Sequence, residues 1–305
     1  MSDHLQRFHF QDHAVRGALV RLDDTLAELQ RRRAYPERIA SMLGEMLAAV
    51  AMIADGLKWP GSVALQSKGS GLIRTTLAEH RPEGMLRAIA RGADEETPLP
   101  QIEDSRLAQL TAGDLIGGDQ LALSLIPPDD DNRNQPYQGL IGWHHDTLAA
   151  NLVEYFAISE QLETRFELYS NGNQARGLLL QRLPNASDAS FITEQNADDF
   201  WTELSLRMQT LQPGELIAES DPALLRNLFA PQNLILAPTR ALAFQCTCNQ
   251  EKTENILRTL GKPDLLDLLE ERGEISVTCE FCGLDYTFDH LATHLLFTPE
   301  PETRH

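Results

Sequence analysis

Four cysteines, all in the last fifth of the 305-residue chain, are the feature that most limits what this sequence can fold into. They form a C-x-C pair, Cys246 and Cys248, and a C-x-x-C pair, Cys279 and Cys282, separated by the 30 residues from 249 to 278. A secreted protein stapled by disulfides spreads its cysteines more widely. Clustered pairs in a reducing compartment therefore indicate metal or redox chemistry.

Zinc is the metal that this pattern predicts. Four thiolates satisfy tetrahedral Zn²⁺ at Zn–S distances of about 2.3 Å, and paired cysteines with a long spacer are typical of zinc sites. We therefore expect one Zn²⁺ per chain, bound by Cys246, Cys248, Cys279 and Cys282. Residues 246–305 are too few to be stable through hydrophobic burial alone, and a bound metal would stabilise them.

Two interpretations of the zinc site remain open. The simpler one is a permanent structural zinc, as in most zinc ribbons. The other is a switch, in which oxidation of the cysteines releases the zinc. The C-x-C pair is unusual for a ribbon, whose paired ligands commonly have at least two residues between them. It also places two thiols near enough for a strained disulfide. Because zinc keeps its ligands as thiolates, an oxidant would meet sulfur that is already in its nucleophilic form.

Oxidation would replace the zinc site by disulfides that stabilise residues 246–305 less. A structural zinc contributes about 10 to 16 kcal/mol of apparent binding energy in small modules. If disulfides formed within each pair, chain entropy would give roughly 1.6 kcal/mol for a three-residue ring, against about 3.7 kcal/mol for a 30-residue ring. We expect such oxidation to unfold 246–305 and to destabilise the segment before it.

Charge and length limit the class of protein further. The formal net charge of −19 argues against a nucleic-acid partner, because duplex binding depends on Lys and Arg residues that neutralise phosphates. A chain of 305 residues predicts a main body with one or two smaller parts. The start of the chain, MSDHLQRFHF, lacks a signal-peptide pattern, and we expect no later stretch of about 20 apolar residues to cross a membrane. We therefore expect a cytoplasmic protein.

Residues 1–189 read as one α/β core domain. Apolar residues at three- and four-residue steps predict a helix over 39–53, with Pro36 in its first turn, and a second helix over 148–156, capped by Asp146. Apolar runs between turn residues predict strands at 62–66, 120–126, 137–143, 166–169 and 177–183, with a hairpin at Asn171-Gly172-Asn173. The fold class is α+β: an N-terminal mixed sheet packed by helices, a helical linker region and a small C-terminal zinc-binding module.

Residues 190–245 have the character of an amphipathic helical linker. Asn196 and Asp221 are expected to cap two of its helices, and prolines keep each helical segment short. The apolar residues on these helices are Phe200, Trp201, Leu204, Met208, Leu224, Leu228 and Phe229. Since the segment has no obvious core of its own, these side chains must dock on another part of the protein.

The remaining domain, 246–305, carries the cysteines. Helices are predicted at 251–260, 264–271 and 289–296, and a strand at 274–278. Gly283 directly follows the second cysteine pair and is typical of a turn that wraps backbone amides around sulfur.

No arrangement of residues in the sequence is typical of an enzyme. His290 and His294 stand four apart on a predicted helix, but four thiolates leave zinc no need of them. His144-His145-Asp146 reads as a strand-to-helix turn, Asp129-Asp130-Asp131 as a solvated loop, and Gly69-x-Gly71 as a turn without the context of a nucleotide-binding loop. We therefore predict a protein that is not an enzyme and has no catalytic residues.

The cysteine pattern, near the end of a chain of about 300 residues, resembles that of the redox-regulated 33-kilodalton heat-shock chaperone family. The resemblance extends over nearly the whole chain, and the cysteine motif is its most specific part. The other matching segments are Ala14-Val15-Arg16-Gly17, Tyr137-Gln138-Gly139, Asp146-Thr147-Leu148-Ala149-Ala150, Ser159-Glu160-Gln161-Leu162, Thr164-Arg165 and Gly273-Glu274-Ile275.

This resemblance implies a chaperone that holds unfolding proteins without ATP. Members of the family are inactive when reduced and zinc-bound, and oxidants together with mild unfolding activate them. Carried over to this chain, the resemblance implies disulfides Cys246–Cys248 and Cys279–Cys282 in the oxidised form. It also implies a metastable linker at 190–245, unfolded client proteins as partners, and a homodimer in the active state.

Two other classes of function, an enzyme and a module that recruits a fixed partner, could use the same cysteines. A thiol-disulfide oxidoreductase would turn over a disulfide substrate, and a zinc enzyme would keep an open position beside three protein ligands, whereas this motif offers four. A zinc module that recruits a fixed partner would bind it in either oxidation state. Suppression of aggregation only at stoichiometric protein, without ATP, would favour the chaperone over the oxidoreductase.

Overall fold

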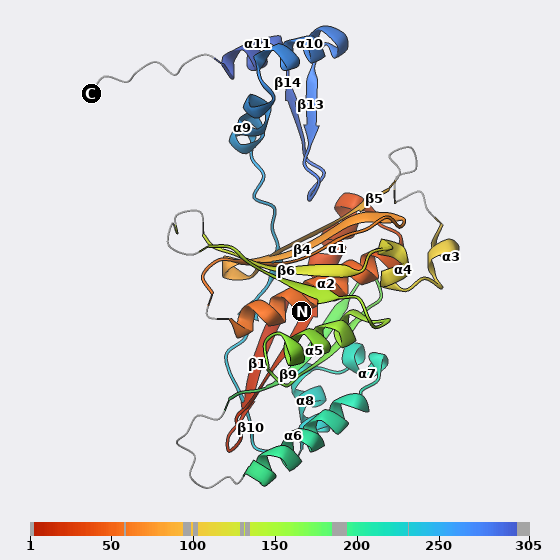
Figure 1. The fold of residues 1–305 in the computed structure, drawn as a ribbon, viewed down its shortest axis with the longest axis vertical. Helices are drawn as coiled ribbons and strands as arrows, with labels where there is room; N and C mark the ends of the chain where they lie inside the picture. Colours follow the sequence, from red (N-terminus) through yellow and green to blue (C-terminus); the bar gives the residue numbers. More distant parts are fainter. Residues whose placement is uncertain are drawn as a thin grey trace, which may run out of the picture. The chain divides into compact units, whose positions relative to one another are not determined.

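The structure is a computed structural model that describes residues 3–57, 59–93, 99, 103–128, 131, 135–184, 194–230 and 232–297. It divides into two compact units, Met1–Gln245 and Cys246–His305 (Figure 1). The predicted division at 189/190 lies outside the described residues, as do Asp129 and Asp130 of the predicted solvated loop.

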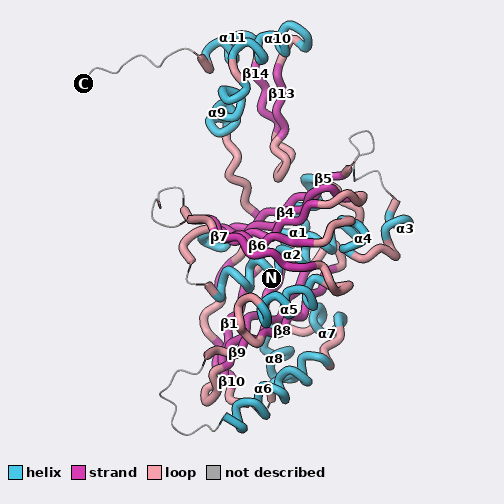
Figure 2. Tube along the Cα trace, viewed as in Figure 1, coloured by secondary structure: helices cyan, strands magenta, loops and turns pink. Residues whose placement is uncertain are grey.

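Two six-stranded sheets build the first unit (Figure 2). The first sheet has the order β10-β1-β2-β9-β8, with β11 also paired to β1, and every one of its pairings is antiparallel. Its strands are β1 His4–Phe10, β2 Val15–Leu22, β8 Thr164–Ser170, β9 Ala175–Arg182, β10 Leu234–Leu236 and β11 Arg240–Ala241.

The second sheet has the order β12-β5-β4-β3-β6-β7. Its strands are β3 Ser62–Lys68, β4 Ile73–Arg81, β5 Met85–Gly92, β6 Gln120–Ile126, β7 Tyr137–Gly142 and β12 Ala243–Phe244. Because β12 runs parallel to β5 while the other pairs are antiparallel, this sheet is mixed. The prediction of a mixed sheet packed by helices is confirmed, and the structure adds a wholly antiparallel sheet to it.

Helix α2, Glu37–Gly56, contacts both sheets and forms the centre of the core. The predicted apolar stripe over 39–53 is confirmed, although Pro36 is the N-cap rather than a residue of the first turn. By length and composition α2 could cross a membrane, contrary to our expectation, but 78% of its most apolar window is buried inside the protein. A helix that is apolar on all sides is the usual core helix of a protein with a layer on each side.

The remaining helices of the first unit surround these sheets. They are α1 Asp24–Arg33, η1 Pro82–Gly84, α3 Asp104–Leu107, α4 Ala112–Ile116, α5 Leu148–Ile158, α6 Glu194–Gln209, α7 Pro213–Ala218 and α8 Asp221–Phe229. Thr147, not Asp146, caps α5, because the Thr147 side chain accepts the N–H of Ala150. Asn196 lies inside α6 and does not cap it.

The hairpin predicted at Asn171-Gly172-Asn173 is confirmed between β8 and β9. The side chain of Asn171 accepts the backbone N–H of Asn173 and of Gln174. Gly172 has a φ of +81°, which an L-residue adopts only with strain. The residues of this short turn therefore determine the register in which β8 and β9 pair.

Helices α6, α7 and α8 cover the face of the first sheet that points away from α2. Their buried residues Phe200, Trp201, Leu204, Met208, Leu216, Leu224, Leu225, Leu228 and Phe229 pack with Phe8, Phe10, Val15, Leu19, Leu178 and Leu180 of the strands. The ring of Phe10 meets the rings of Phe200 and Phe229 edge to face. The predicted docking of this apolar segment on another part of the chain is thus confirmed, and its partner is the sheet.

The second unit contains helices α9 Gln250–Leu260, α10 Lys262–Arg272 and α11 His290–Leu295 and the hairpin of β13 Ile275–Thr278 and β14 Asp285–Phe288. The three predicted helices and the predicted strand are confirmed to within a few residues. The apolar core that the structure describes in this unit is small, with buried side chains Leu257, Leu265, Leu269, Ile275, Phe288 and Leu296. A core of this size needs further stabilisation.

Candidate metal centre

The four cysteine side chains meet at one point of the second unit. Their sulfur atoms all lie within 4.8 Å of one another. Cys246 Sγ is 3.6 Å from Cys279 Sγ, and Cys248 Sγ is 3.3 Å from Cys282 Sγ. Four sulfurs at about 2.3 Å from a tetrahedral zinc ion would be about 3.8 Å apart. The residues therefore fit a four-thiolate metal site.

The β13–β14 hairpin positions the second cysteine pair. Cys279 and Cys282 lie in its turn, directly after β13, where Cys279 N–H donates to the carbonyl of Leu284 at 2.8 Å. Gly283 N–H donates to the carbonyl of Cys279 at 2.7 Å, and Gly283 has a φ of +69°. The glycine thus allows a tight turn that brings both thiols to one side of the hairpin.

The first cysteine pair lies in the extended chain before α9. Asn249 caps this helix by accepting the N–H of Lys252 and so ends the extended segment directly after Cys248. The hydroxyl of Tyr286, on β14, donates to Cys248 Sγ at 3.2 Å. Sequence reasoning missed Tyr286, because its distance of 38 residues from Cys248 leaves no local signal.

The thiols differ in acidity when no metal is bound. Burial raises the pKa of Cys279, but the backbone amides of Cys282 and Phe281 outweigh it and bring the pKa to about 7. Burial raises the pKa of Cys246 to about 12, and burial also raises the pKa of Cys282. Cys279 is therefore more readily converted to the reactive thiolate than Cys246 or Cys282.

The other sequence candidates lie outside the cluster. Among the residues that the structure describes, these four cysteines are the one group able to hold a metal ion. His290 and His294 are on α11 and are not part of it. His144 Nδ1 lies 2.8 Å from the carboxylate of Glu154, in the predicted turn between β7 and α5. Gly71 N–H donates to the carbonyl of Ile116, which confirms a packed turn at Gly69-x-Gly71.

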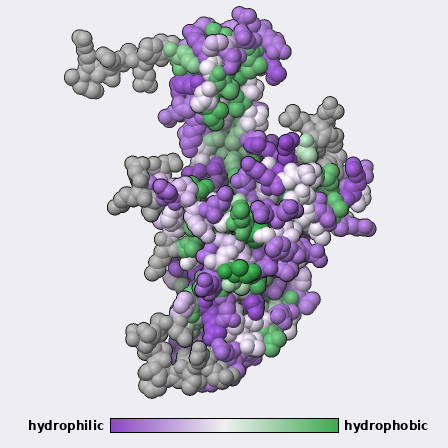
Figure 3. Space-filling view, in the orientation of Figure 1, coloured by the Kyte–Doolittle hydropathy of each residue, from purple (hydrophilic) through white to green (hydrophobic). Residues whose placement is uncertain are grey.

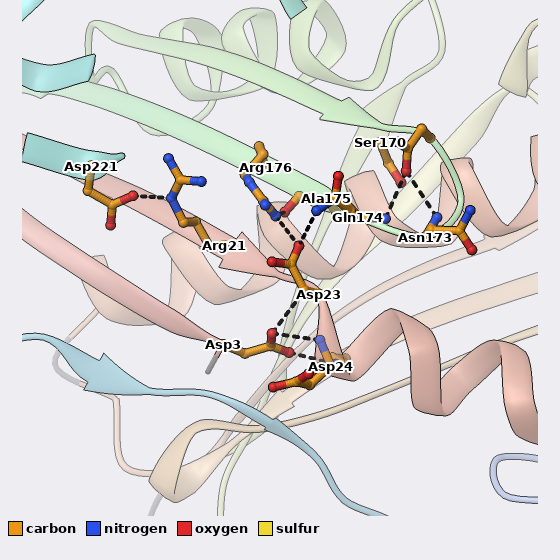
Figure 4. Close-up of polar contacts among 12 residues, drawn as sticks. Asp3, Arg21, Asp23, Asp24, Ser170, Asn173, Gln174, Ala175, Arg176 and Asp221 are labelled. Carbon is orange, nitrogen blue, oxygen red and sulfur yellow. Dashed lines mark hydrogen bonds and ion pairs between the residues drawn. The ribbon is translucent and has the colours of Figure 1, made fainter. Parts of the chain in front are cut away.

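A second polar cluster, in the first unit, fastens helix α8 to the sheet (Figure 4). Asp221 accepts a hydrogen bond from Arg21 Nε, and its other carboxylate oxygen lies 2.6 Å from His4 Nε2. The Arg21 and Asp221 side chains are each only 10% exposed. Asp221 was predicted as a helix cap, but Ser220 is the N-cap, and the Asp221 carboxylate is used in this long-range ion pair instead.

Arg21 has a like-charged neighbour on the same face of the sheet. Arg176 of β9 is its directly paired residue and is almost fully buried. Arg176 Nη1 lies 2.6 Å from Asp23 Oδ1 (Figure 4). Each arginine thus depends on its own carboxylate, because two buried like charges side by side destabilise a sheet.

Comparison with known proteins bears on the whole chain. The family model described as "Hsp33 protein" matches residues 3–289. The chain belongs to the Hsp33 family. A 33 kDa chaperonin of Pseudomonas aeruginosa is 35% identical, with 100% of this chain and 99% of that protein covered. A 33 kDa chaperonin of Methylobacillus flagellatus is 31% identical, with 98% and 96% covered.

A solved structure agrees with this family's fold. The 33 kDa chaperonin (heat shock protein 33 homolog) of Thermotoga maritima superposes with a TM-score of 0.78 at 22% identity, covering 96% of this chain and 97% of that one. Membership of the Hsp33 family makes this protein a chaperone, whose partners are unfolded proteins, and not an enzyme. The resemblance found in the cysteine motif is thereby confirmed.

Proposed function

We propose that this chaperone is an ATP-independent holdase that oxidation of its four cysteines switches on. The observation that carries the proposal is the cluster itself: four thiols within 4.8 Å of one another, three of them half-buried and so open to small oxidants. A permanent structural site needs no such access. We further propose that the protein is cytoplasmic, where a reducing environment keeps the thiols free.

In the reduced state Cys246, Cys248, Cys279 and Cys282 would hold one Zn²⁺. The ion would keep the sulfurs as thiolates and tie the chain before α9 to the β13–β14 hairpin.

Oxidation within each pair is the proposed chemistry. As zinc-bound thiolates, Cys246 with Cys248 and Cys279 with Cys282 would each lose two electrons and form one S–S bond, and the zinc ion would leave. Each equivalent of hydrogen peroxide would take up those two electrons and two protons from solvent and be reduced to two molecules of water. The alternative pairing joins Cys246 to Cys279 and Cys248 to Cys282, whose sulfurs are 3.6 and 3.3 Å apart. That pairing would close rings of more than 30 residues and keep the chain before α9 joined to the β13–β14 hairpin. It would therefore not unfold residues 246–305.

Loss of the zinc site would expose apolar surface to which unfolded client proteins can bind. Residues 246–305 would unfold first because their core is small. The segment 194–229 would follow, and both its apolar helix faces and the sheet face with Phe8, Phe10 and Leu19 would become accessible. Before oxidation, the face of the first unit that Figure 3 shows has only small apolar patches among hydrophilic residues. We propose that the opened form is a homodimer.

The test compares reduced, zinc-loaded protein with protein oxidised by peroxide, in a light-scattering assay of a heat-unfolded client. We expect aggregation to be suppressed only by the oxidised form, at a stoichiometric ratio and without ATP. Catalytic turnover of a small disulfide substrate by the same samples would instead support the oxidoreductase, and equal client binding in both states would support a fixed-partner module. Peptide mapping of the oxidised sample reads the disulfide pairing.

A further inference from the structure

A hollow of about 260 Å³ in the first unit is lined by arginines. It lies between the C-terminal end of α2 and the α2-facing side of the first sheet, next to Ala237. Arg7 of β1 and Arg16 of β2 line it, with His9 at its rim and Ala18 and Leu179 on the sheet side. A water molecule occupies about 30 Å³ in the liquid, so the hollow has room for a small ligand and waters.

The positions of the two arginines follow from the strand register. Arg7 is paired with Ala18, and His9 with Arg16, so these side chains share one face of the sheet. The small side chain of Ala18 leaves space in front of Arg7. Gly56, at the end of α2, admits the guanidinium group of Arg16, since a Cβ there would lie 2.0 Å from Arg16 Nη2.

Arg16 is held in place by a neutral partner. Its Nε and Nη2 both donate to Gln181 Oε1, at 3.0 and 2.6 Å, and Gln181 Nε2 donates to Thr164 Oγ1 at 3.0 Å. Gln181 and Thr164 are buried. Arg16 is half-buried, and an arginine withdrawn from water is normally balanced by a carboxylate. Here the amide fixes the guanidinium without balancing its charge, and burial lowers the pKa of Arg16.

One carboxylate must serve three arginines at this place. Asp55 Oδ1 lies 2.9 Å from Arg240 Nη1 and 3.6 Å from Arg7 Nε. Asp55 is the sole acidic residue among the described residues that line the hollow. Arg7 Nε is buried, with no hydrogen-bond partner in the part of the chain that the structure describes. Among the residues that line the hollow, Arg7 and Arg16 against Asp55 leave one excess positive charge, and Asp55 is also paired with Arg240 outside the hollow, on a chain whose net charge is −19.

We propose that this hollow binds a small phosphate-type dianion between Arg7 and Arg16. Guanidinium groups donate paired hydrogen bonds to phosphate oxygens, and a phosphate monoester carries about −1.5 to −2 charges near neutral pH, which the two guanidinium groups can balance. The ligand is inorganic phosphate or the phosphate group of a small monoester. This inference is independent of the redox chemistry, since the hollow belongs to the first unit and the cysteines to the second.

The experiment is isothermal titration of the full-length, reduced, zinc-loaded protein with inorganic phosphate at constant ionic strength, set with chloride. We expect saturable binding of one phosphate per chain. Arg7→Gln and Arg16→Gln should each weaken the binding at least tenfold. Arg31→Gln, an exposed arginine of α1 paired with Glu28, is the matched control and should bind as the wild type does. Circular dichroism and zinc content verify that each variant is folded.

Parallel titrations separate the two sources of the ligand. Equal affinity for methyl phosphate and inorganic phosphate would assign the site to the phosphate group of either, and preference for inorganic phosphate would assign it to the free ion. If Arg16→Gln does not fold, the proposal rests on Arg7→Gln, whose side chain is 38% exposed. Absence of saturable binding, acetate binding as tight as phosphate, or equal weakening in Arg31→Gln would overturn the proposal.

Discussion

At the scale of single residues, Asp221 joins helix α8 to the sheet through Arg21 and His4. Removing its negative charge leaves Arg21 buried beside Arg176 without a carboxylate. We expect Asp221→Asn to lower the free energy of unfolding by about 3 to 5 kcal/mol, the usual effect of breaking a buried pair. Urea denaturation of the reduced, zinc-loaded protein measures this change.

Asp198→Asn is the control for Asp221→Asn within the same helical segment. Asp198 pairs with Arg182, but its side chain is exposed, so we expect a change of no more than about 1 kcal/mol. Equal effects of the two substitutions would mean that the buried pair does not anchor α8.

His80, on β4, makes stability depend on pH. Burial lowers the pKa of His80 to about 4, whereas the unfolded imidazole titrates near 6.5. Below pH 6.5 the unfolded state binds a proton that the folded state does not, so acidification favours unfolding. This histidine alone should remove about 2 kcal/mol between pH 7 and pH 5. We expect the pH dependence of urea unfolding to be smaller in His80→Gln by this amount.

The control for His80→Gln is His9→Gln, at an exposed position of β1. It should keep the pH dependence of the wild type. The same loss of pH dependence in His9→Gln would contradict the assignment to His80.

Residue roles could be predicted where residue type and spacing form a known motif. The spacing of Cys246, Cys248, Cys279 and Cys282 predicted one cluster, and the structure brings all four together. The cap predicted at Asp221 was wrong, because the pairing with Arg21, 200 residues away, is not visible in neighbouring residues. Tyr286, the hydrogen-bond donor to Cys248, was missed for the same reason.

At the scale of elements, the packing of α6 on the sheet controls how easily the helical segment opens. Leu204 is fully buried against the strands. We expect Leu204→Ala to lower the free energy of unfolding by about 2 to 5 kcal/mol, through lost burial and the cavity left behind. Limited proteolysis should then cut within 194–229 faster in the reduced protein.

Leu206→Ala is the matched control, since Leu206 lies on the same helix but is 58% exposed. It should change proteolysis and stability little. Equally fast cleavage of both variants would show that local helix propensity, rather than docking on the sheet, limits opening.

Elements with regular patterns could be predicted, and those without them could not. The stripe of α2 and the hairpin at Asn171-Gly172-Asn173 were found because period and turn chemistry are local. The predictions omitted the long strands β1, β2, β4 and β5 and the short strands β10, β11, β12 and β14. Arg21 in β2 and Glu79 in β4 are charged but buried, so they interrupt the apolar pattern by which these strands could have been recognised. The burial of Arg21 depends on Asp221, 200 residues away, and that of Glu79 on Arg87 of the neighbouring strand.

At the scale of the whole molecule, the two units differ in how they are stabilised. The first has a large core around α2, whereas the second buries few apolar side chains and gathers four thiols. Zinc would therefore be the main stabiliser of the second unit. Chain length and clustered cysteines made a separate C-terminal module predictable, but not the presence of two sheets in the first unit, because strand pairing is non-local.

The most direct test of the account follows zinc release, free thiols and suppression of client aggregation together, in one sample treated with hypochlorous acid or peroxide. The account predicts that two disulfides form, that one zinc ion per chain is released, and that chaperone activity rises with this release. Peptide mapping should identify Cys246–Cys248 and Cys279–Cys282. Complete zinc release and thiol oxidation without any gain in chaperone activity would contradict it.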